Sequence, residues 1–266
     1  MAERFIAMRS SSKTAIKWCA RFAFLAVLAG CKTGVYPDPN DPNDVGKLSP
    51  AIVRINLRQA SDFLNDRMAR GEVTDEEYKT LIAKRADELL PYLDLSQVTD
   101  QNAWEYAELF ITGRKWDKAK ELLLQATKNP VNDDRRVNDN LRLARVLCEM
   151  GDVTEGIKKA RSTFNVGDID AAPILPAVLF EIVPAGLGKG NNPELAALLI
   201  DAAHQHMRVK VDVKNEAGKA FIQAKDLLLR KAFGKATTIY QRAGEYEKAA
   251  DAIKQLEEFE LSQTPT

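Results

Sequence analysis

Apolar residues recur along most of the chain at the three- and four-residue spacing that places side chains on one face of an α-helix. The run of Ala119, Leu122, Leu123 and Ala126 is one example. No stretch of convincing length alternates apolar and polar residues in the way that a half-buried strand does. The pattern therefore predicts an all-α fold.

Capping residues, glycines and prolines divide this pattern into separate helices. Ser49-Pro50 starts the first helix, and the capping-box pattern of Thr74 and Glu77 opens the second, which ends before Pro91. We expect these two helices to form an antiparallel hairpin. Further helices are expected at residues 100–112, from the turn at Gly113 to Asn129-Pro130, on both sides of Gly151, at 168–184, from Asn192-Pro193, at 216–243 with Gly234 as a candidate break, and at 246–261.

Two segments in the middle of the chain have a distinctive composition. Residues 168–184 are apolar on nearly every side after Pro176 and too short to span a membrane, so a helix buried in the middle of the domain is expected. The glycine-rich segment 186–192 is not a phosphate-binding loop, because Gly190 and not Ser or Thr follows Lys189. We interpret it as a flexible connection.

Three segments share a turn between helices that is followed by a small residue. Each has a glycine near the turn and an alanine or glycine about five residues later, where two helices can cross closely. The segments are 113–119, 151–156 and 244–249, preceded by Ala107 and Phe110, by Ala144 and Leu147, and by Tyr240. They resemble the tetratricopeptide repeat over residues 101–130, 138–164 and 231–260, with the first turn one residue out of register.

The resemblance implies a solenoid of helix–turn–helix units, whose concave face grips extended peptides or partner helices. Carried over position by position, the lining of that face would be Trp104, Glu108, Asn138, Arg145, Glu149, Thr238 and Arg242. The alternative is that Trp104 belongs to the core and that the charged residues form ordinary solvated helix faces. Both interpretations stay open at the level of the sequence.

The first 31 residues have the parts of an export signal. Five basic residues precede the seven apolar residues 22–28, which are too few to cross a bilayer. The next residues complete the segment Leu28-Ala29-Gly30-Cys31, which resembles the lipobox of bacterial lipoproteins. The resemblance implies cleavage before Cys31 and lipid attachment to its thiol. Two alternatives are an ordinary thiol at Cys31 and a translation start at Met8.

Composition narrows the function classes. The full chain has 38 basic and 38 acidic residues, and cleavage would remove five basic and one acidic residue, leaving 33 and 37. This balance gives no electrostatic footprint for nucleic acid. Cys148 would be the only free thiol, so no disulfide framework is expected.

The expected organisation is a signal at 1–30, a lipidated tether at 31–48, a helical domain at 49–262 and a disordered tail at 263–266. Pro37, Pro39 and Pro42 favour an extended tether. Its acidic run does not form an EF-hand loop, because Val45 occupies the third ligand position and Ile52 the place of the bidentate glutamate.

The chemistry of an active site is not evident. His204 and His206 are two residues apart on a helix, so they cannot share one metal ion, and His206 is expected to be a satisfied core residue. Cys148 is expected to act as a small buried hydrophobe. No carboxylate pair lies in an apolar setting that would separate two pKa values for acid–base work. We therefore expect neither an enzyme nor a cofactor.

The sequence predicts a lipoprotein that acts as a protein-binding scaffold or assembly factor in a bacterial cell envelope. Lys32 after the lipidated cysteine is similar to the family's outer-membrane signal. One alternative is a glycan- or small-ligand-binding protein with a pocket at the helix 174–183. Another is a cell-wall hydrolase, which would need His206 and Glu181 in one cleft.

Overall fold

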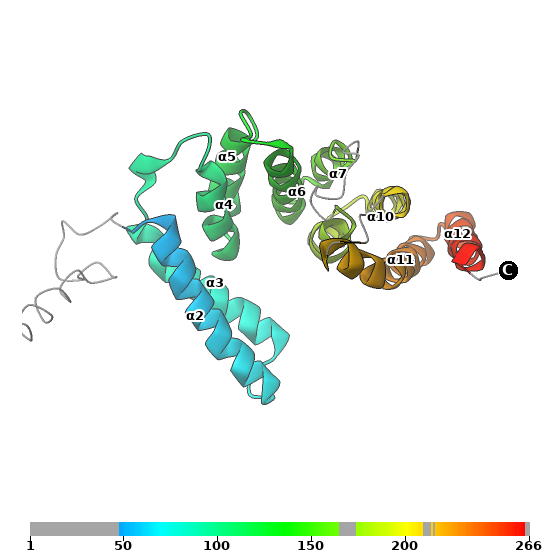
Figure 1. Cartoon of the computed structure of the whole chain (residues 1–266), viewed down its shortest axis with the longest axis horizontal. Coiled ribbons are helices and arrows are strands. Elements are labelled where there is room, and N and C mark those ends of the chain that lie inside the picture. Colours follow the sequence, from blue (N-terminus) through cyan, green and yellow to red (C-terminus); the bar gives the residue numbers. More distant parts are fainter. Residues whose placement is uncertain (1–47, 165–173, 210–213, 215, 264–266) are drawn as a thin grey trace, which may run out of the picture.

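The computed structural model describes residues 48–164, 174–209, 214 and 216–263, and these ranges are helical apart from turns and one isolated bridge (Figure 1). The helices are α2 (Pro50–Ala69), α3 (Asp75–Leu89), η1 (Leu90–Tyr92), η2 (Leu95–Gln97), α4 (Ala103–Thr112), α5 (Trp116–Ala126), α6 (Asp133–Glu149), α7 (Val153–Arg161), α8 (Ile174–Ala177), η3 (Val178–Ile182), α9 (Val183–Gly186), α10 (Asn192–Arg208), α11 (Glu216–Arg242) and α12 (Tyr246–Gln263). The predicted all-α class is confirmed.

Several predicted features lie outside the described residues: the lipobox with Cys31, the tether up to residue 47, the first part of the predicted helix 168–184, and residues 264–266. The predicted tail began at Gln263, but that residue is the last of α12. Among the helices described, we find none that combines the length and the apolar character needed to cross a bilayer.

Successive helices pack against one another in chain order. The pairs are α2 with α3, α4 with α5, α5 with α6, α6 with α7, α10 with α11, and α11 with α12, and α6 also packs on η3 and α9. Figure 1 shows them as a row, in which the α2–α3 hairpin projects at one end and α12 lies at the other. The buried hydrophobic residues form two clusters, one from α2 to α6 and the other from α6 to α12.

The folded domain begins one residue earlier than expected. Leu48, which we assigned to the tether, is buried and forms a parallel bridge with Leu93. Its N–H donates to the Tyr92 carbonyl at 2.8 Å, and its carbonyl accepts from the Asp94 N–H at 3.0 Å. These two bonds fix the start of α2 against the η1 turn.

The predicted caps of the first two helices are confirmed. The Ser49 hydroxyl accepts a hydrogen bond from the Ile52 N–H at 3.5 Å. Thr74 and Glu77 form both bonds of a capping box, with the Thr74 N–H donating to Glu77 Oε2 at 2.8 Å. Each bond satisfies a backbone or side-chain group that the first helical turn leaves without a partner.

The three turns singled out in the sequence have the same backbone hydrogen-bond pattern. In each, the residue after the C-cap has a positive φ: Arg114 at 56°, Gly151 at 88° and Gly244 at 77°. The N–H of the following residue donates to the carbonyl five residues earlier, at 2.8, 2.9 and 2.9 Å respectively. This bond is characteristic of the Schellman motif, which ends a helix and reverses the chain.

The one-residue offset of the first turn has a packing cause. Arg114, and not Gly113, takes the left-handed conformation there, while Gly113 has a φ of −78°. A Cβ atom on Gly113 would lie 2.7 Å from Leu90 Cδ1. A glycine at position 113 therefore permits the close contact with Leu90, and the hydrogen-bond pattern of the turn is the same as in the other two turns.

The small residues after the three turns lie at helix crossings, as expected. Ala119 and Ala249 are buried. A Cβ atom on Gly156 would lie 2.6 Å from Cys148 Sγ and 2.9 Å from the Ala144 carbonyl oxygen. The backbones of α6 and α7 therefore approach more closely than a side chain at Gly156 would allow.

α11 continues through Gly234 without a break, contrary to our expectation. Phe233 and Ala236, on the buried face, hold the helix against its neighbours. Their packing outweighs the intrinsic cost of a glycine in a helix, which is about 1 kcal/mol.

Gly156→Ala is expected to lower the free energy of unfolding by about 1–3 kcal/mol, because the methyl group overpacks the α6–α7 crossing. The matched control is Gly234→Ala, where nothing lies within 4 Å of the new Cβ. That change should raise the free energy of unfolding by about 0.5–1 kcal/mol. Urea unfolding followed by circular dichroism measures both, and effects of the same sign would contradict the close crossing.

α6 joins two hydrophobic clusters. Leu143, Val146 and Leu147 pack with residues of α2 to α5, whereas Leu141 and Cys148 pack with residues of α7 to α12. Burial raises the pKa of the Cys148 thiol to about 11. The prediction that Cys148 is a small buried hydrophobe is confirmed, and α6 is the element that both halves of the domain share.

α8, η3 and α9 form one continuous helix with a π-helical middle turn, in which the Val183 N–H donates to the Val178 carbonyl. Pro184 accounts for the wide turn. A proline has no N–H and its ring clashes with the carbonyl four residues earlier, here that of Phe180, so a regular α-helix would be disrupted. The wider turn accommodates the ring.

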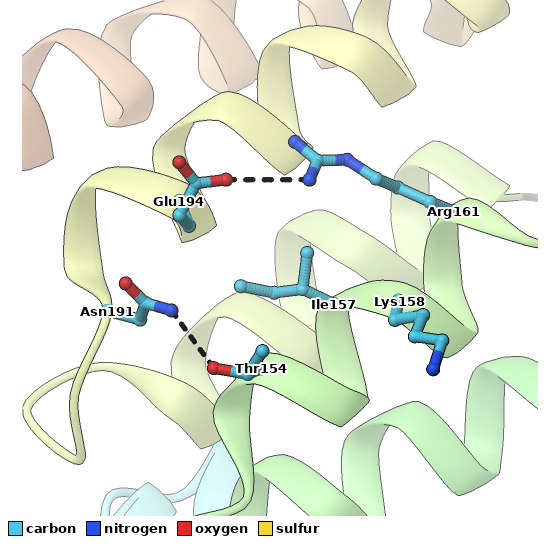
Figure 2. A pocket seen from close by; sticks show the side chains of 6 residues that line it. All are labelled: Thr154, Ile157, Lys158, Arg161, Asn191 and Glu194. Carbon is cyan, nitrogen blue, oxygen red and sulfur yellow. Dashed lines mark hydrogen bonds and ion pairs between the residues drawn. The ribbon is translucent and has the colours of Figure 1, made fainter.

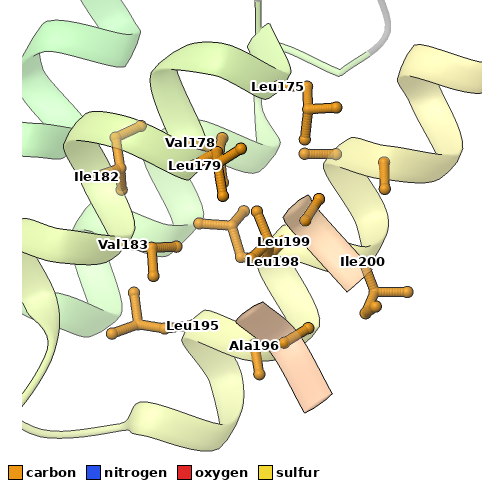
Figure 3. Packing of buried hydrophobic residues seen from close by; sticks show 14 of the residues in the cluster. Leu175, Val178, Leu179, Ile182, Val183, Leu195, Ala196, Leu198, Leu199 and Ile200 are labelled. Atoms are coloured by element: carbon orange, nitrogen blue, oxygen red, sulfur yellow. The ribbon is translucent and has the colours of Figure 1, made fainter. Parts of the chain in front are cut away.

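This helix packs on α10, as Figure 3 shows. The facing residues are Leu175, Val178, Leu179, Ile182 and Val183 on one side and Leu195, Ala196, Leu198 and Leu199 on the other. Phe180 is nevertheless 53% exposed, and Glu181 is exposed as well. The expected buried helix is therefore confirmed for most of its residues, and Phe180 and Glu181 of the π turn are exceptions to it.

Candidate functional site

A hollow of about 700 Å³ lies between α3 on one side and α6 with the η3–α9 helix on the other. The turn between α4 and α5 also contributes to it. Its lining residues are Glu76, Tyr78, Lys79, Ile82, Ile111, Thr112, Arg114, Trp116, Arg145, Glu149, Phe180, Glu181, Pro184 and Ala185. Two of the predicted protein-binding residues, Arg145 and Glu149, are among them.

Three aromatic side chains from three different helices line this hollow. Tyr78 comes from α3, Trp116 from the start of α5, and Phe180 from η3. Phe180 is more than half exposed, although its helix is otherwise largely buried. Aromatic residues held by rigid helices around a concave surface are typical of binding hot spots, because they lose little conformational entropy on contact.

The π turn that presents Phe180 is held from α11. Lys235 Nζ donates to the Leu179 carbonyl at 3.3 Å, and burial lowers the pKa of this lysine. Lys231, one turn earlier on α11, places its Nζ 5.8 Å from the centre of the Phe180 ring. Such π-helical turns occur frequently at functional sites. Here these contacts hold the turn that carries the exposed Phe180 ring.

The carboxylates in the hollow already have cationic partners. Arg145 Nη1 lies 3.0 Å from Glu181 Oε2, and Lys189 Nζ lies 2.7 Å from Glu149 Oε2. Arg114, by contrast, makes no ion pair or hydrogen bond through its side chain within the described ranges of the chain. The hollow therefore offers polar and apolar surface in similar measure, together with the free guanidinium group of Arg114.

Trp104 and Glu108 lie elsewhere, in an ion-pair network that joins α2, α4 and α6. The network runs from Arg54 to Glu105 and Glu108, from Glu108 to Arg142, from Arg142 to Asp139 and from Asp139 to Arg135. The Arg135 guanidinium lies 3.6 Å from the centre of the Trp104 ring. These groups contact one another and connect three helices.

The other three predicted residues do not line the hollow. Asn138 is half-buried on α6, while Thr238 and Arg242 are exposed on α11. The Thr238 hydroxyl donates to the Gly234 carbonyl of its own helix at 2.9 Å. Of the seven residues, the structure thus brings Arg145 and Glu149 together in one hollow.

Sequence reasoning missed the aromatic residues of the hollow and Arg114. Pro184, four residues after Phe180, was the available signal, because a proline at that spacing disturbs the preceding turn. Trp116 lies in the first repeat-like segment, 113–119, but its spacing does not indicate whether its side chain packs in the core or lines a surface hollow.

A second pocket, of about 420 Å³, lies between α7 and the start of α10 (Figure 2). Its polar groups bond to each other: Asn191 Nδ2 donates to Thr154 Oγ1 at 3.1 Å, and Arg161 Nη1 lies 3.4 Å from Glu194 Oε2. Lys189, in the adjacent glycine-rich loop, donates to the Glu149 carbonyl at 2.9 Å. Because these polar groups already bond to other residues of the protein, they are not free to bind a ligand, and the hollow is the better candidate site.

His206 is buried on α10, with its ring centre 4.5 Å from that of Phe221 on α11. The predicted burial is confirmed, but its Nε2 has no hydrogen-bond partner, so the expected satisfied histidine is wrong. The hydrolase alternative needed His206 and Glu181 in one cleft. Glu181 lines the hollow, but His206 does not. Within the described residues, no group of three His, Cys, Asp or Glu side chains is placed to hold a metal ion.

No protein-family model matches this chain, and no curated protein matches it either. The function proposed below therefore depends on the sequence patterns and on the geometry of the hollow.

Proposed function

We propose that this chain is a lipid-anchored scaffold or assembly factor that binds another envelope protein in the hollow between α3 and η3. The observation that carries the proposal is Phe180, an aromatic ring that is 53% exposed on a helix packed into the core. Tyr78 and Trp116 line the same hollow. A segment inserted there would bury all three rings, and aromatic anchors of this kind supply most of the energy of many interfaces.

A tetratricopeptide-like solenoid is part of this proposal. The identical hydrogen-bond pattern of three turns supports it, as does the close crossing of α6 and α7 at Gly156. In such an array each helix pair contacts only its neighbours, and the stacked pairs leave a concave surface. α3, α6 and η3 are the elements that would hold the partner.

The lipobox resemblance at Cys31 supports a location of the scaffold at a membrane. Lipid on this residue and on the new N-terminus would hold the domain at a membrane, because two or more acyl chains anchor stably where one does not. Lys32 favours the outer membrane, on its periplasmic side, in a cell that has one. The partner is then a protein or peptide of the same compartment.

The test is crosslinking in cells with a photoreactive residue at Ile82, which lines the hollow, followed by mass spectrometry. Phe180→Ala should reduce the yield of the specific adduct by about tenfold or more, since a hot spot contributes about 2 kcal/mol. The matched control is Phe63→Ala, because Phe63 is 61% exposed on α2 and lies outside the hollow. Equal yields from the two variants would exclude the hollow as the binding site.

A glycan or other small ligand is the second candidate for the same hollow. Tyr78 and Trp116 favour it, because aromatic faces stack on apolar ring surfaces. Denaturing the purified lipoprotein and analysing the released molecules distinguishes this candidate. A ligand that is present in the wild type and absent from Phe180→Ala would displace the protein-binding proposal.

A further inference from the structure

The last helix of the row carries two apolar faces. One face packs on α11 through Ala249, Ala252 and Phe259, all of which are buried. The other face is exposed and lies about a third of a turn around the helix. Figure 1 shows α12 at the end of the row, beyond α11.

Four residues form the exposed face. Tyr246 is 70% exposed, Ile253 is 42% exposed and Leu261 is 74% exposed, and Ala250 lies between the first two. At 100° per residue the four fall within a sector of about 80°. Exposed apolar residues that gather on one face of a helix indicate a docking surface.

Carboxylates accompany the stripe. Glu257 falls within its sector, and Glu247, Asp251 and Glu258 follow along one flank, with Lys254 as the single cation among them. Asp251 accepts a bond from Gln255, and Glu258 lies 3.7 Å from Lys254. Neither Glu247 nor Glu257 makes an ion pair or hydrogen bond through its side chain in the part of the chain that the structure describes. Two free carboxylates therefore accompany the stripe, with Glu257 within its sector and Glu247 on its flank.

We propose that this face of α12 binds an amphipathic helix of another protein, with apolar residues that pack on Tyr246, Ile253 and Leu261. Lysine or arginine residues of that helix would face Glu247 and Glu257. Two helices recognise each other in this way when their apolar faces pack together and the charges that flank those faces are complementary. The hollow has no lining residue from α12, so this surface is separate from it. A scaffold with both surfaces can hold two proteins at once.

A second copy of the chain is a poorer fit. An antiparallel pair of α12 helices about Ile253 would place no cation opposite Glu257 and would bring Glu247 near the acidic end of the other copy. A parallel pair would place Glu257 beside its own counterpart. Like charges that meet in this way destabilise an interface. An anionic bilayer would be repelled for the same reason.

The experiment uses the full lipoprotein in detergent and two fluorescent peptides of about 20 residues, long enough to form helices. Both carry leucines at spacings of three and four, with lysines on the flanks of one and glutamates on the flanks of the other. The lysine peptide should bind about tenfold more tightly in fluorescence anisotropy, because the two unpaired carboxylates attract its lysines and repel the glutamates of the other peptide.

Ile253→Asp should weaken binding of the lysine peptide by about tenfold. The pair Glu247→Lys with Glu257→Lys should reverse the preference between the peptides. Both changes lie at exposed positions, so the circular dichroism of the variants should match the wild type. Phe180→Ala should bind as the wild type does, which separates this proposal from that of the hollow.

Equal binding of the two peptides, or wild-type binding by Ile253→Asp, would overturn the proposal. So would self-association in sedimentation velocity that Ile253→Asp abolishes, because the occupant would then be a second copy. Binding of the domain to phosphatidylglycerol vesicles through Ile253 would overturn it in favour of a lipid surface.

Discussion

Asp139→Ala is expected to lower the free energy of unfolding by about 3–5 kcal/mol, the largest effect among the single changes considered. Asp139 is 1% exposed and forms ion pairs with Arg135 and Arg142. Without this carboxylate, the guanidinium of Arg135 stays half-enclosed against Trp104 without its ion-pair partner, and only the weaker influence of the Glu108 charge remains. The Nε of Arg135 is already buried without a hydrogen-bond partner.

Replacing both charges gives a different result. Burial raises the pKa of Asp139 and lowers the pKa of Arg135, so for both groups the loss of hydration outweighs the attraction between them. The double variant Asp139→Leu with Arg135→Met is therefore expected to lie within about 1 kcal/mol of the wild type, or to exceed it. Urea unfolding of the two single variants and the double variant completes a double-mutant cycle.

The matched control for Asp139 is Asp133→Ala on the same helix. Asp133 pairs with Arg136 at 3.0 Å, and its side chain is 80% exposed. An exposed pair of this kind contributes about 0–1 kcal/mol. If Asp139→Ala cost no more than Asp133→Ala, the network around Trp104 would be a surface feature and would not connect the helices.

The helices and turns were predictable because local chemistry fixes them. The capping box of Thr74 and Glu77 uses bonds between residues three apart, and the turn at Gly151 needs one residue with a positive φ. Gly234 was predicted wrongly as a break for the opposite reason. Its effect depends on whether the surrounding helix is packed, and that is decided by residues distant in the sequence.

The candidate site was predictable only in part. Arg145 and Glu149, which both line the hollow, were carried over from the tetratricopeptide resemblance. The exposure of Phe180 was not predictable, because it depends on the π turn before Pro184 and on the α3 hairpin across the hollow. Trp104 showed the converse. The resemblance offered it for a binding face, with a place in the core as the alternative, but Arg54 and Arg135 from two other helices lie over its ring.

Acidification from pH 7 to pH 4 is expected to remove about 3 kcal/mol of stability through His206 alone. Burial lowers the pKa of His206 from 6.5 to about 4, and the charge of Lys225 on α11 adds to this effect. Between these two pKa values the unfolded chain binds a proton that the folded protein does not. The contribution is therefore fully present above pH 6.5 and is lost as the pH falls towards 4.

The measurement is urea unfolding at several pH values for the wild type and for His206→Leu, with His204→Gln as the control. Carboxylates also titrate in this range, so the informative quantity is the difference between wild type and variant at each pH. The stability of His206→Leu should fall by about 3 kcal/mol less than that of the wild type, whereas His204→Gln should follow the wild type. Parallel curves for wild type and His206→Leu would mean that the histidine between α10 and α11 is solvated and takes up its proton without opening the helix pair.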